Sequence, residues 1–288
     1  MTRTAKGDNE EQAVPGVQND IVKALLRLHT ELRRTLAASD VDFDRILGKN
    51  RKGDQQRGFD VAADVAVRRL LVEAFGSGII LSEESADYSF GETAPAYRFI
   101  VDPVDGSDNW ARGLPLSSVT VAVLPADGPI ALDRVVASLV GGLEEETSIV
   151  AMRGEGAHHG AERLQTSDTR RIADAFVSCE LNHFAPTAPV GELFSAARAV
   201  RSYGCASRAI SLVASGAIDA HIDVRSRLTP ESFLAAAAIL CEVGGCVLDA
   251  QGNGLGEFED LCQTTTIVAT ATEELAREII DALAGSGT

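Results

Sequence analysis

The most informative stretch of this chain is Asp102-Pro103-Val104-Asp105-Gly106-Ser107-Asp108-Asn109-Trp110, which follows an apolar, strand-like run at 97–101. A second acidic segment, Glu83-Glu84-Ser85, follows another apolar run at 78–81. Acidic side chains at the ends of neighbouring strands converge, and without a partner they repel one another and raise one another's pKa. A hard divalent cation removes that penalty, and an all-oxygen ligand set favours magnesium or manganese. The sequence therefore predicts a metal site where these two strands end.

The Gly106-Ser107 turn supplies a second feature of a reactive site. It comes directly after Asp105, and it can present backbone N–H groups and a hydroxyl to an anion, as a helix N-terminus does. Phosphoryl chemistry requires a metal on one side of the substrate and anion donors on the other. We therefore predict a site that binds and processes a phosphate group.

Length, charge and cysteine content narrow the class of protein. The chain has 288 residues, of which 45% are apolar, so it can bury a large core. A formal charge of −16 argues against nucleic acid as a partner, and it means that an anionic substrate needs bound cations at the site. No apolar run is long enough to span a bilayer, so no membrane partner is expected. Five cysteines, an odd number, predict reduced thiols in a cytoplasmic protein.

The acidic motifs resemble those of a known family. Asp102–Ser107, preceded by Glu83-Glu84-Ser85, is similar to the motif of the inositol monophosphatase family of magnesium-dependent, lithium-sensitive phosphatases. That family includes fructose-bisphosphatases, 3'-phosphonucleotide phosphatases and some histidinol-phosphate phosphatases. Four further segments resemble its motifs in the same order, at 59–64, 153–157, 204–207 and 242–245. The resemblance implies an α/β fold, a layered α-β-α-β-α sandwich of the sugar-phosphatase type, and a homodimer.

The resemblance also implies roles for the acidic residues. Glu83, Asp102, the Val104 carbonyl and Ser107 would hold a first magnesium ion and the attacking water. Asp102 and Asp105 would share a second ion. Ser107 stands where the family usually has threonine, and it keeps the hydroxyl that orients the water. Glu83, Asp102, Asp105 and Ser107 are therefore the expected catalytic residues.

Weaker roles follow for the residues around this set. Asp64 would reach a third magnesium ion through water, and Gly106 and Ser107 would donate backbone N–H groups to the phosphate. The alternative is that these acids only cap helices and end strands, as Asp commonly does. Their clustering in this order favours the functional interpretation.

The chain departs from the family at one metal ligand. The family has a Trp-Asp pair before its Glu-Ala-Gly-Gly motif, and the aspartate position falls on Ser232 here, directly after Glu231. Thr229 and Pro230 form a good helix start, with an acid in the first turn. Glu231 is therefore either a residue that complements the helix dipole or a metal ligand that replaces the missing carboxylate.

Substrate contacts are indicated more faintly. By the resemblance, Asp223 is the nearest match to an acid that contacts sugar or inositol hydroxyls. Cys205, Ser207 and Arg208 follow Gly204, where a pocket wall is expected. Arg208 would bind a second phosphate or stack on a base, and its simpler interpretation is an ordinary surface ion pair.

The rest of the chain predicts one layered unit over 1–288, with a metal-binding lobe at about 18–155 and a substrate-wall lobe at 156–288. Residues 1–17 are polar, and helices are expected over 21–36 and from Asp64 to about Phe75. The polar, basic segment 48–58 is expected to be either a solvated loop or a lid over the metals. His158 and His159 are expected in a turn. Strands are expected at 78–81, 97–101, 119–124, 135–139, 147–152 and 174–180.

Two functions remain open from the sequence. The first is a magnesium-dependent phosphomonoesterase that acts on a small polyol, sugar, nucleotide or amino-alcohol phosphate. The second is a catalytically impaired family member that binds a metabolite or regulates a partner, because the usual aspartate is Ser232.

Overall fold

The structure is a computed structural model that describes residues 20–38, 45–53 and 55–285. The expected polar end at 1–17 lies outside the described residues. The helices are α1 (Asp20–Ala38), α2 (Gly58–Phe75), α3 (Ser107–Ala111), α4 (Ala188–Ala196), α5 (Ala206–Ala214), α6 (Pro230–Glu242) and α7 (Glu273–Leu283), with short 3-10 turns at Leu132–Arg134 and Ile172–Asp174. No described helix is both long and apolar enough to cross a bilayer.

The strands form two main sheets and two small ribbons. They are β1 (Ile46–Lys49), β2 (Gln55–Arg57), β3 (Gly78–Ser82), β4 (Tyr88–Phe90), β5 (Tyr97–Asp105), β6 (Ser118–Pro125), β7 (Ile130–Ala131), β8 (Ala137–Gly142), β9 (Ser148–Met152), β10 (Gly156–His159), β11 (Glu162–Arg163), β12 (Phe176–Cys179), β13 (Ala199–Arg201), β14 (Ala220–Leu228), β15 (Cys246–Leu248), β16 (Glu257–Phe258) and β17 (Thr265–Thr270).

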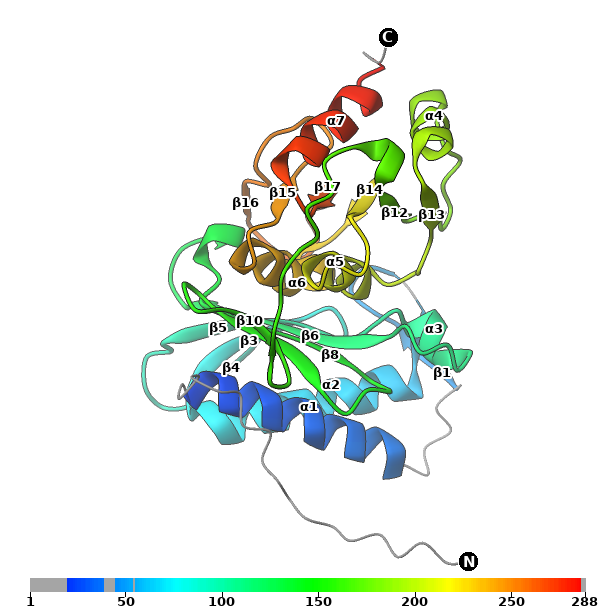
Figure 1. The fold of residues 1–288 in the computed structure, drawn as a ribbon. Helices are drawn as coiled ribbons and strands as arrows, with labels where there is room; N and C mark the ends of the chain where they lie inside the picture. Colours follow the sequence, from blue (N-terminus) through cyan, green and yellow to red (C-terminus); the bar gives the residue numbers. More distant parts are fainter. Residues whose placement is uncertain (1–19, 39–44, 54, 286–288) are drawn as a thin grey trace, which may run out of the picture.

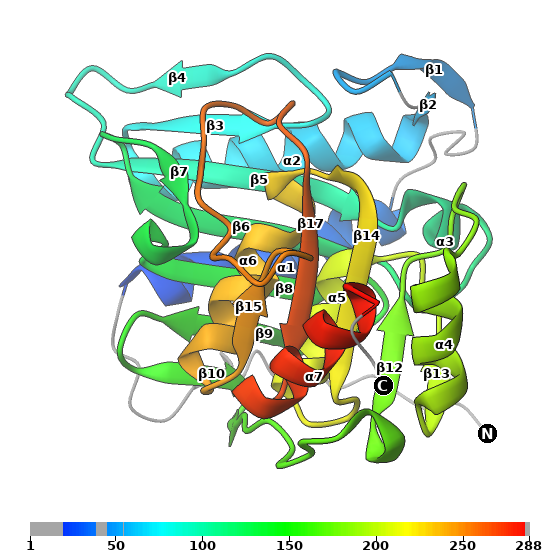
Figure 2. The ribbon, with the colours of Figure 1, turned by 90° about the horizontal axis from the view of Figure 1, so that it is seen from above.

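Five layers stack on one another (Figure 1). Helices α1 and α2 cover one face of the eight-stranded sheet, and α5 and α6 lie between that sheet and the five-stranded sheet. Helices α4 and α7 cover the outer face of the second sheet, as Figure 2 shows from above. Three clusters of buried apolar residues fill the spaces between the layers. One joins α1 and α2 to the first sheet, one surrounds α5 and α6 between the two sheets, and one joins the second sheet to α4 and α7. Hydrophobic burial therefore holds all the layers together. This α-β-α-β-α sandwich confirms the predicted fold class.

The order of the first sheet is β11-β10-β9-β8-β6-β5-β3-β4. Strands β3 and β5 are parallel neighbours, so their carboxyl ends, at Ser82 and Asp105, lie at the same edge of the sheet. Strand β5 pairs with β6 through Asp102 and Thr120 and again through Asp105 and Ser118, which leaves one extra residue on β5. This β-bulge changes the alternation of side chains, and it brings Asp102 and Asp105 to the same pocket.

Strand order in the second sheet is β13-β12-β14-β17-β15. Helix α6 follows β14 and packs against β5, β6, β8 and β9 of the first sheet. Its first turn therefore lies over the acidic ends of β3 and β5. The first sheet also contains β10 and β11, which lie after residue 155. The division into two lobes at 155/156 stays a prediction.

Several expected elements need correction. The helix over 21–36 is confirmed, but α2 begins at Gly58 and not at Asp64, because the Asp60 carboxylate accepts the Arg57 N–H at 2.8 Å and caps an earlier first turn. The expected strand at 135–139 is β8, shifted to Ala137–Gly142 by the 3-10 turn before it.

Two expected loops are partly strands. The segment 48–58 contains residues of the β1–β2 hairpin, whose basic and amide side chains bind the acidic turn after β3. His158 and His159 lie in β10 and not in a turn, since they pair with Val150 and Ile149 of β9. His159 Nε2 also contacts Thr147 Oγ1 at 2.8 Å.

Candidate active site

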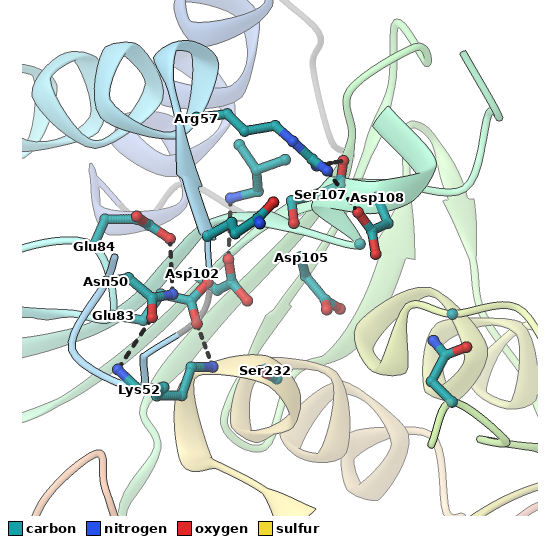
Figure 3. Close-up of a pocket in the computed structure, with 15 residues that line it drawn as sticks. Asn50, Lys52, Arg57, Glu83, Glu84, Asp102, Asp105, Ser107, Asp108 and Ser232 are labelled. Carbon is teal, nitrogen blue, oxygen red and sulfur yellow. Dashed lines mark hydrogen bonds and ion pairs between the residues drawn. The ribbon is translucent and has the colours of Figure 1, made fainter. Parts of the chain in front are cut away.

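A polar pocket of about 360 Å³ opens at the ends of β3 and β5 (Figure 3). The β1–β2 hairpin, the bulge of β5, the start of α3 and the first turn of α6 all contribute to it. Its lining residues are Asn50, Lys52, Gln55, Arg57, Glu83, Glu84, Asp102, Val104, Asp105, Gly106, Ser107, Asp108, Asn182, Gly204 and Ser232.

Glu83 directly follows β3, and Asp102 lies near the end of β5, where the bulge begins. Asp102 is only 1% exposed, and its Oδ1 accepts the Val104 N–H at 3.0 Å. Burial raises the pKa of Asp102 well above its ordinary value, and the negative charges of Glu83 and Asp105 raise it further. A carboxylate in this setting needs a positive partner in order to stay ionised.

Asp105 is held by three donors from the start of α5. The Ser207 N–H and hydroxyl bond to its Oδ2 at 2.8 and 2.5 Å, and the Cys205 thiol lies 3.1 Å from the same oxygen. Burial raises the pKa of Asp105, while the Ser207 bonds lower it. Ser207 Oγ also contacts Ser118 Oγ at 2.6 Å. The carboxylate is thus fixed in one orientation.

The turn after Asp105 requires glycine. Gly106 has φ of +79°, and a Cβ there would lie 3.0 Å from both the Leu116 carbonyl and Cys205 Cβ. The turn is anchored by the Asn109 side chain, which donates to the carbonyls of Leu116 at 3.0 Å and Tyr203 at 2.7 Å. Ser107 then begins α3 at the wall of the pocket.

Asp64 is engaged away from the pocket lining. Its two oxygens accept the hydroxyls of Ser82 and Ser85, each at 2.6 Å, and Arg68 Nε lies 3.1 Å from Oδ2. In the structure Asp64 therefore supports the turn that carries Glu83. Its expected contact with a third ion through water stays a prediction.

Lys52 is the main site residue for which the sequence assigned no role. It belongs to the β1–β2 hairpin, and its ammonium contacts the carboxylates of Glu83 and Glu231 and lies 3.3 Å from Thr229 Oγ1. The sequence did indicate that a cation lies near the acids, because 48–58 is a basic segment near an acidic site. Its partners were not readable, since Glu231 lies far away along the chain.

The hairpin is fastened on both sides of the pocket. The Arg51 N–H donates to the Glu83 carbonyl at 3.2 Å, and Gln56 Nε2 donates to the Glu84 carboxylate at 2.7 Å. Arg57 pairs with Asp108 at 2.9 Å on the other side. These bonds hold the hairpin over the acidic strand ends.

Helix α6 places Ser232 on the pocket wall, whereas Glu231 does not line the pocket and adjoins it through its contact with Lys52. Glu231 is 1% exposed, and its Oε1 lies 2.8 Å from Lys52 Nζ and accepts the Thr229 hydroxyl. The Thr120 hydroxyl donates to the Glu231 carbonyl at 2.8 Å and fixes the start of the helix. Glu231 Oε2 is buried and has no hydrogen-bond partner among the described residues. Glu231 thus has a cationic partner from another part of the chain, and its role as a metal ligand stays a prediction.

None of the four residues expected to contact substrate lines this pocket. Cys205 and Ser207 orient Asp105 instead. Arg208 forms a bidentate ion pair with Glu145, in which one of the two bonds is 3.0 Å long. It therefore forms an ion pair, the simpler of the two roles expected for it, and does not line the pocket. Asp223 is fully buried and is bound by Arg225 at 2.7 and 3.0 Å. Asn182, which the sequence did not single out, lines the pocket on this side.

The acids share a pocket but do not meet at one point. Within residues 20–38, 45–53 and 55–285, no three His, Cys, Asp or Glu side chains are close enough to hold an ion by themselves. Repulsion separates like charges, and the Lys52 ammonium stands between Glu83 and Glu231. A metal at this site would need backbone, hydroxyl, water or substrate oxygens in addition to the carboxylates.

Comparison with known proteins identifies the family. The family model for the inositol monophosphatase family matches residues 14–287. An inositol-1-monophosphatase of Aeropyrum pernix is 30% identical over 254 residues, which cover 85% of this chain and 90% of that protein. A fructose-1,6-bisphosphatase/inositol-1-monophosphatase of Thermococcus kodakarensis is 28% identical over 244 residues, with 82% and 86% covered.

Solved structures show the same fold. The extragenic suppressor protein SuhB of Bartonella henselae superposes with a TM-score of 0.77 at 22% identity, covering 92% of this chain and 98% of that one. An inositol monophosphatase of Thermotoga maritima gives 0.76 at 19% identity, covering 93% and 98%. The chain belongs to the inositol monophosphatase family. It is accordingly a phosphoric monoester hydrolase, of a family of metal-dependent phosphatases.

Proposed function

We propose that this protein is a magnesium-dependent phosphomonoesterase that hydrolyses a small phosphorylated metabolite. The observation that carries the proposal is the shared pocket of Glu83, Asp102, Asp105 and Ser107 beneath the β1–β2 hairpin. A pocket of about 360 Å³ is at the small end of ligand sites, which suits a compact phosphate ester. The proposal includes a cytoplasmic location, which the odd number of cysteines indicates, and a homodimer, which the family resemblance implies.

The donor set fits a hard divalent cation. The candidate ligands are oxygens of Glu83, Asp102, Val104, Asp105 and Glu231, and magnesium prefers such ligands, with manganese as a substitute. The unpartnered, buried Oε2 of Glu231 supports this assignment, because an isolated carboxylate oxygen is costly to bury. When bound, the metal would lower the pKa of a water molecule and neutralise phosphoryl charge.

The chain's own residues perform the remaining tasks. We assign to Ser107 the orientation of the attacking water, through its hydroxyl, and to the Gly106 and Ser107 N–H groups the binding of phosphate oxygens. Ser207 and Cys205 keep the Asp105 carboxylate in place. Asp64 acts through the turn that carries Glu83, and its role with a third ion belongs to the proposal.

The substrate class is proposed in general terms. The relatives include an inositol-1-monophosphatase, a fructose-1,6-bisphosphatase/inositol-1-monophosphatase and a bifunctional NADP phosphatase/NAD kinase. Their names support polyol, sugar and nucleotide phosphates as candidates, and the family resemblance adds amino-alcohol phosphates. Asp223 is neutralised by Arg225 in the structure, so it contacts a substrate hydroxyl only if that ion pair opens.

Phosphate release from a panel of esters tests the proposal. The panel contains inositol 1-phosphate, fructose 1,6-bisphosphate, histidinol phosphate, adenosine 3',5'-bisphosphate and nucleoside monophosphates, each with and without magnesium. We expect magnesium-dependent release from one class, and Asp105→Asn should abolish it while circular dichroism shows an intact fold. Turnover that survives in Asp105→Asn refutes the site assignment. Folded wild-type protein that binds a panel ester without hydrolysing it would favour the metabolite-binding alternative, which rests on Ser232.

A further inference from the structure

The Lys52 ammonium forms its closest contacts with two carboxylates from different parts of the chain. Its Nζ lies 2.8 Å from Glu231 Oε1, and it contacts Glu83 Oε2 more closely still. The lysine side chain is 22% exposed, whereas those of Glu83 and Glu231 are 10% and 0% exposed. One cation that belongs to the protein therefore pairs with both Glu83 and Glu231 and offsets part of their negative charge.

The same two carboxylates belong to the proposed metal site. Glu83 is an expected ligand of the first ion, and Glu231 is the side chain that stands next to the missing aspartate at Ser232. A carboxylate oxygen bonded to an ammonium has one lone-pair direction less to offer to a metal. The positive charge of Lys52 also repels any divalent ion that approaches the same oxygens.

Resting on the proposed function, we propose that Lys52 competes with the divalent cation for Glu83 and Glu231, and so sets the metal affinity of this chain. The ammonium keeps the acid cluster stable before the ion binds, and the ion must displace it. Displaced from these two carboxylates, Lys52 stays in the pocket, where a phosphate group that enters would give its ammonium a new anionic partner. Metal and phosphate should therefore strengthen each other's binding through this residue.

Calorimetric titration with magnesium chloride, without substrate or phosphate, tests the competition. Lys52→Met removes the charge and keeps most of the side-chain volume, and we expect the variant to bind magnesium about tenfold more tightly than the wild type. Lys49→Met is the matched control, because Lys49 is an exposed lysine of the same hairpin. Its magnesium affinity should equal that of the wild type. Equal or weaker magnesium binding by Lys52→Met overturns the proposal.

Inorganic phosphate supplies a second readout. Adding it to the wild type should tighten magnesium binding, and in Lys52→Met this gain should shrink, because the residue that links the two ligands is absent. The partner is checked in the Glu231→Gln background, where adding Lys52→Met should change magnesium affinity less than it does alone. An equal change in both backgrounds overturns the assignment of Glu231 as the contested ligand.

If Lys52→Met does not fold, NMR spectra of the wild-type protein test the competition between Lys52 and magnesium. The lysines of the chain are Lys6, Lys23, Lys49 and Lys52, so ¹³C-methylated lysines give few resonances, and Lys52→Arg assigns the relevant one. Magnesium should shift the Lys52 resonance and leave that of Lys49 in place. A Lys52 resonance that does not move while calorimetry records magnesium binding overturns the competition alone. Absence of both magnesium binding and phosphate release overturns the proposed function as well.

Discussion

Replacement of Ser207 by alanine tests whether the support of Asp105 matters for function. The change removes a hydroxyl that lies 2.5 Å from Asp105 Oδ2 and 2.6 Å from Ser118 Oγ, while the Ser207 N–H bond at 2.8 Å remains. A hydrogen bond to a charged group contributes about 1.5–3 kcal/mol. Because that bond lowers the pKa of Asp105, its loss should raise the pKa and weaken metal binding.

We expect Ser207→Ala to lower the free energy of unfolding by about 1–2 kcal/mol and the catalytic efficiency about tenfold or more. Urea denaturation and the magnesium dependence of phosphate release measure the two effects. Ser211→Ala is the matched control, since Ser211 is also buried in α5 and its hydroxyl has no hydrogen-bond partner among the described residues. If both variants behave alike in stability and magnesium requirement, the hydroxyl of Ser207 does not position Asp105.

Two further changes probe the turn and the second sheet. Gly106→Ala should cost about 2–3 kcal/mol and most of the activity, because it adds contacts at 3.0 Å to a strained φ, whereas Gly113→Ala, with positive φ but open space, should cost about 1 kcal/mol. Burial lowers the pKa of His221 from 6.5 to about 4, so its contribution to stability is complete above pH 6.5 and falls towards pH 4. Urea denaturation at several pH values should show that the free energy of unfolding falls by about 3 kcal/mol between pH 6.5 and pH 4 because of His221. In His221→Asn this part of the pH dependence should disappear.

The motifs at strand ends were predictable because they are local. Glu83, Asp102 and Asp105 each follow an apolar run, and the parallel pairing of β3 and β5 then brings the strand ends together. Helix α1 was equally clear from its apolar spacing. The start of α2 was not, since a side chain-to-backbone bond at Asp60 outweighed the pattern.

Contacts between distant segments were not predictable in the same way. The substrate role assigned to Asp223 depends on whether its charge is free. Arg225, two residues later and so on the same face of a strand, binds it, and Arg225 also lies 3.9 Å from Glu180 of another segment. Arg208 finds its partner in the loop after β8. The partners of Lys52 come from the turn after β3 and from α6, and no pattern in the hairpin sequence specifies either of them.

The position of Ser232 shows how such distant contacts bear on catalysis. A carboxylate lost from one helical position cannot be restored by its neighbour on an ideal helix surface, because successive side chains point about 100° apart. Glu231 nevertheless reaches the acid cluster, since it is longer than aspartate and its carbonyl is held by Thr120 at the very start of α6. The same reach brings it to Lys52. At this position the pocket wall carries the Ser232 hydroxyl, and the neighbouring carboxylate of Glu231 is paired with a lysine. Under the proposed competition, the magnesium affinity of this chain therefore depends on how readily Lys52 leaves Glu231.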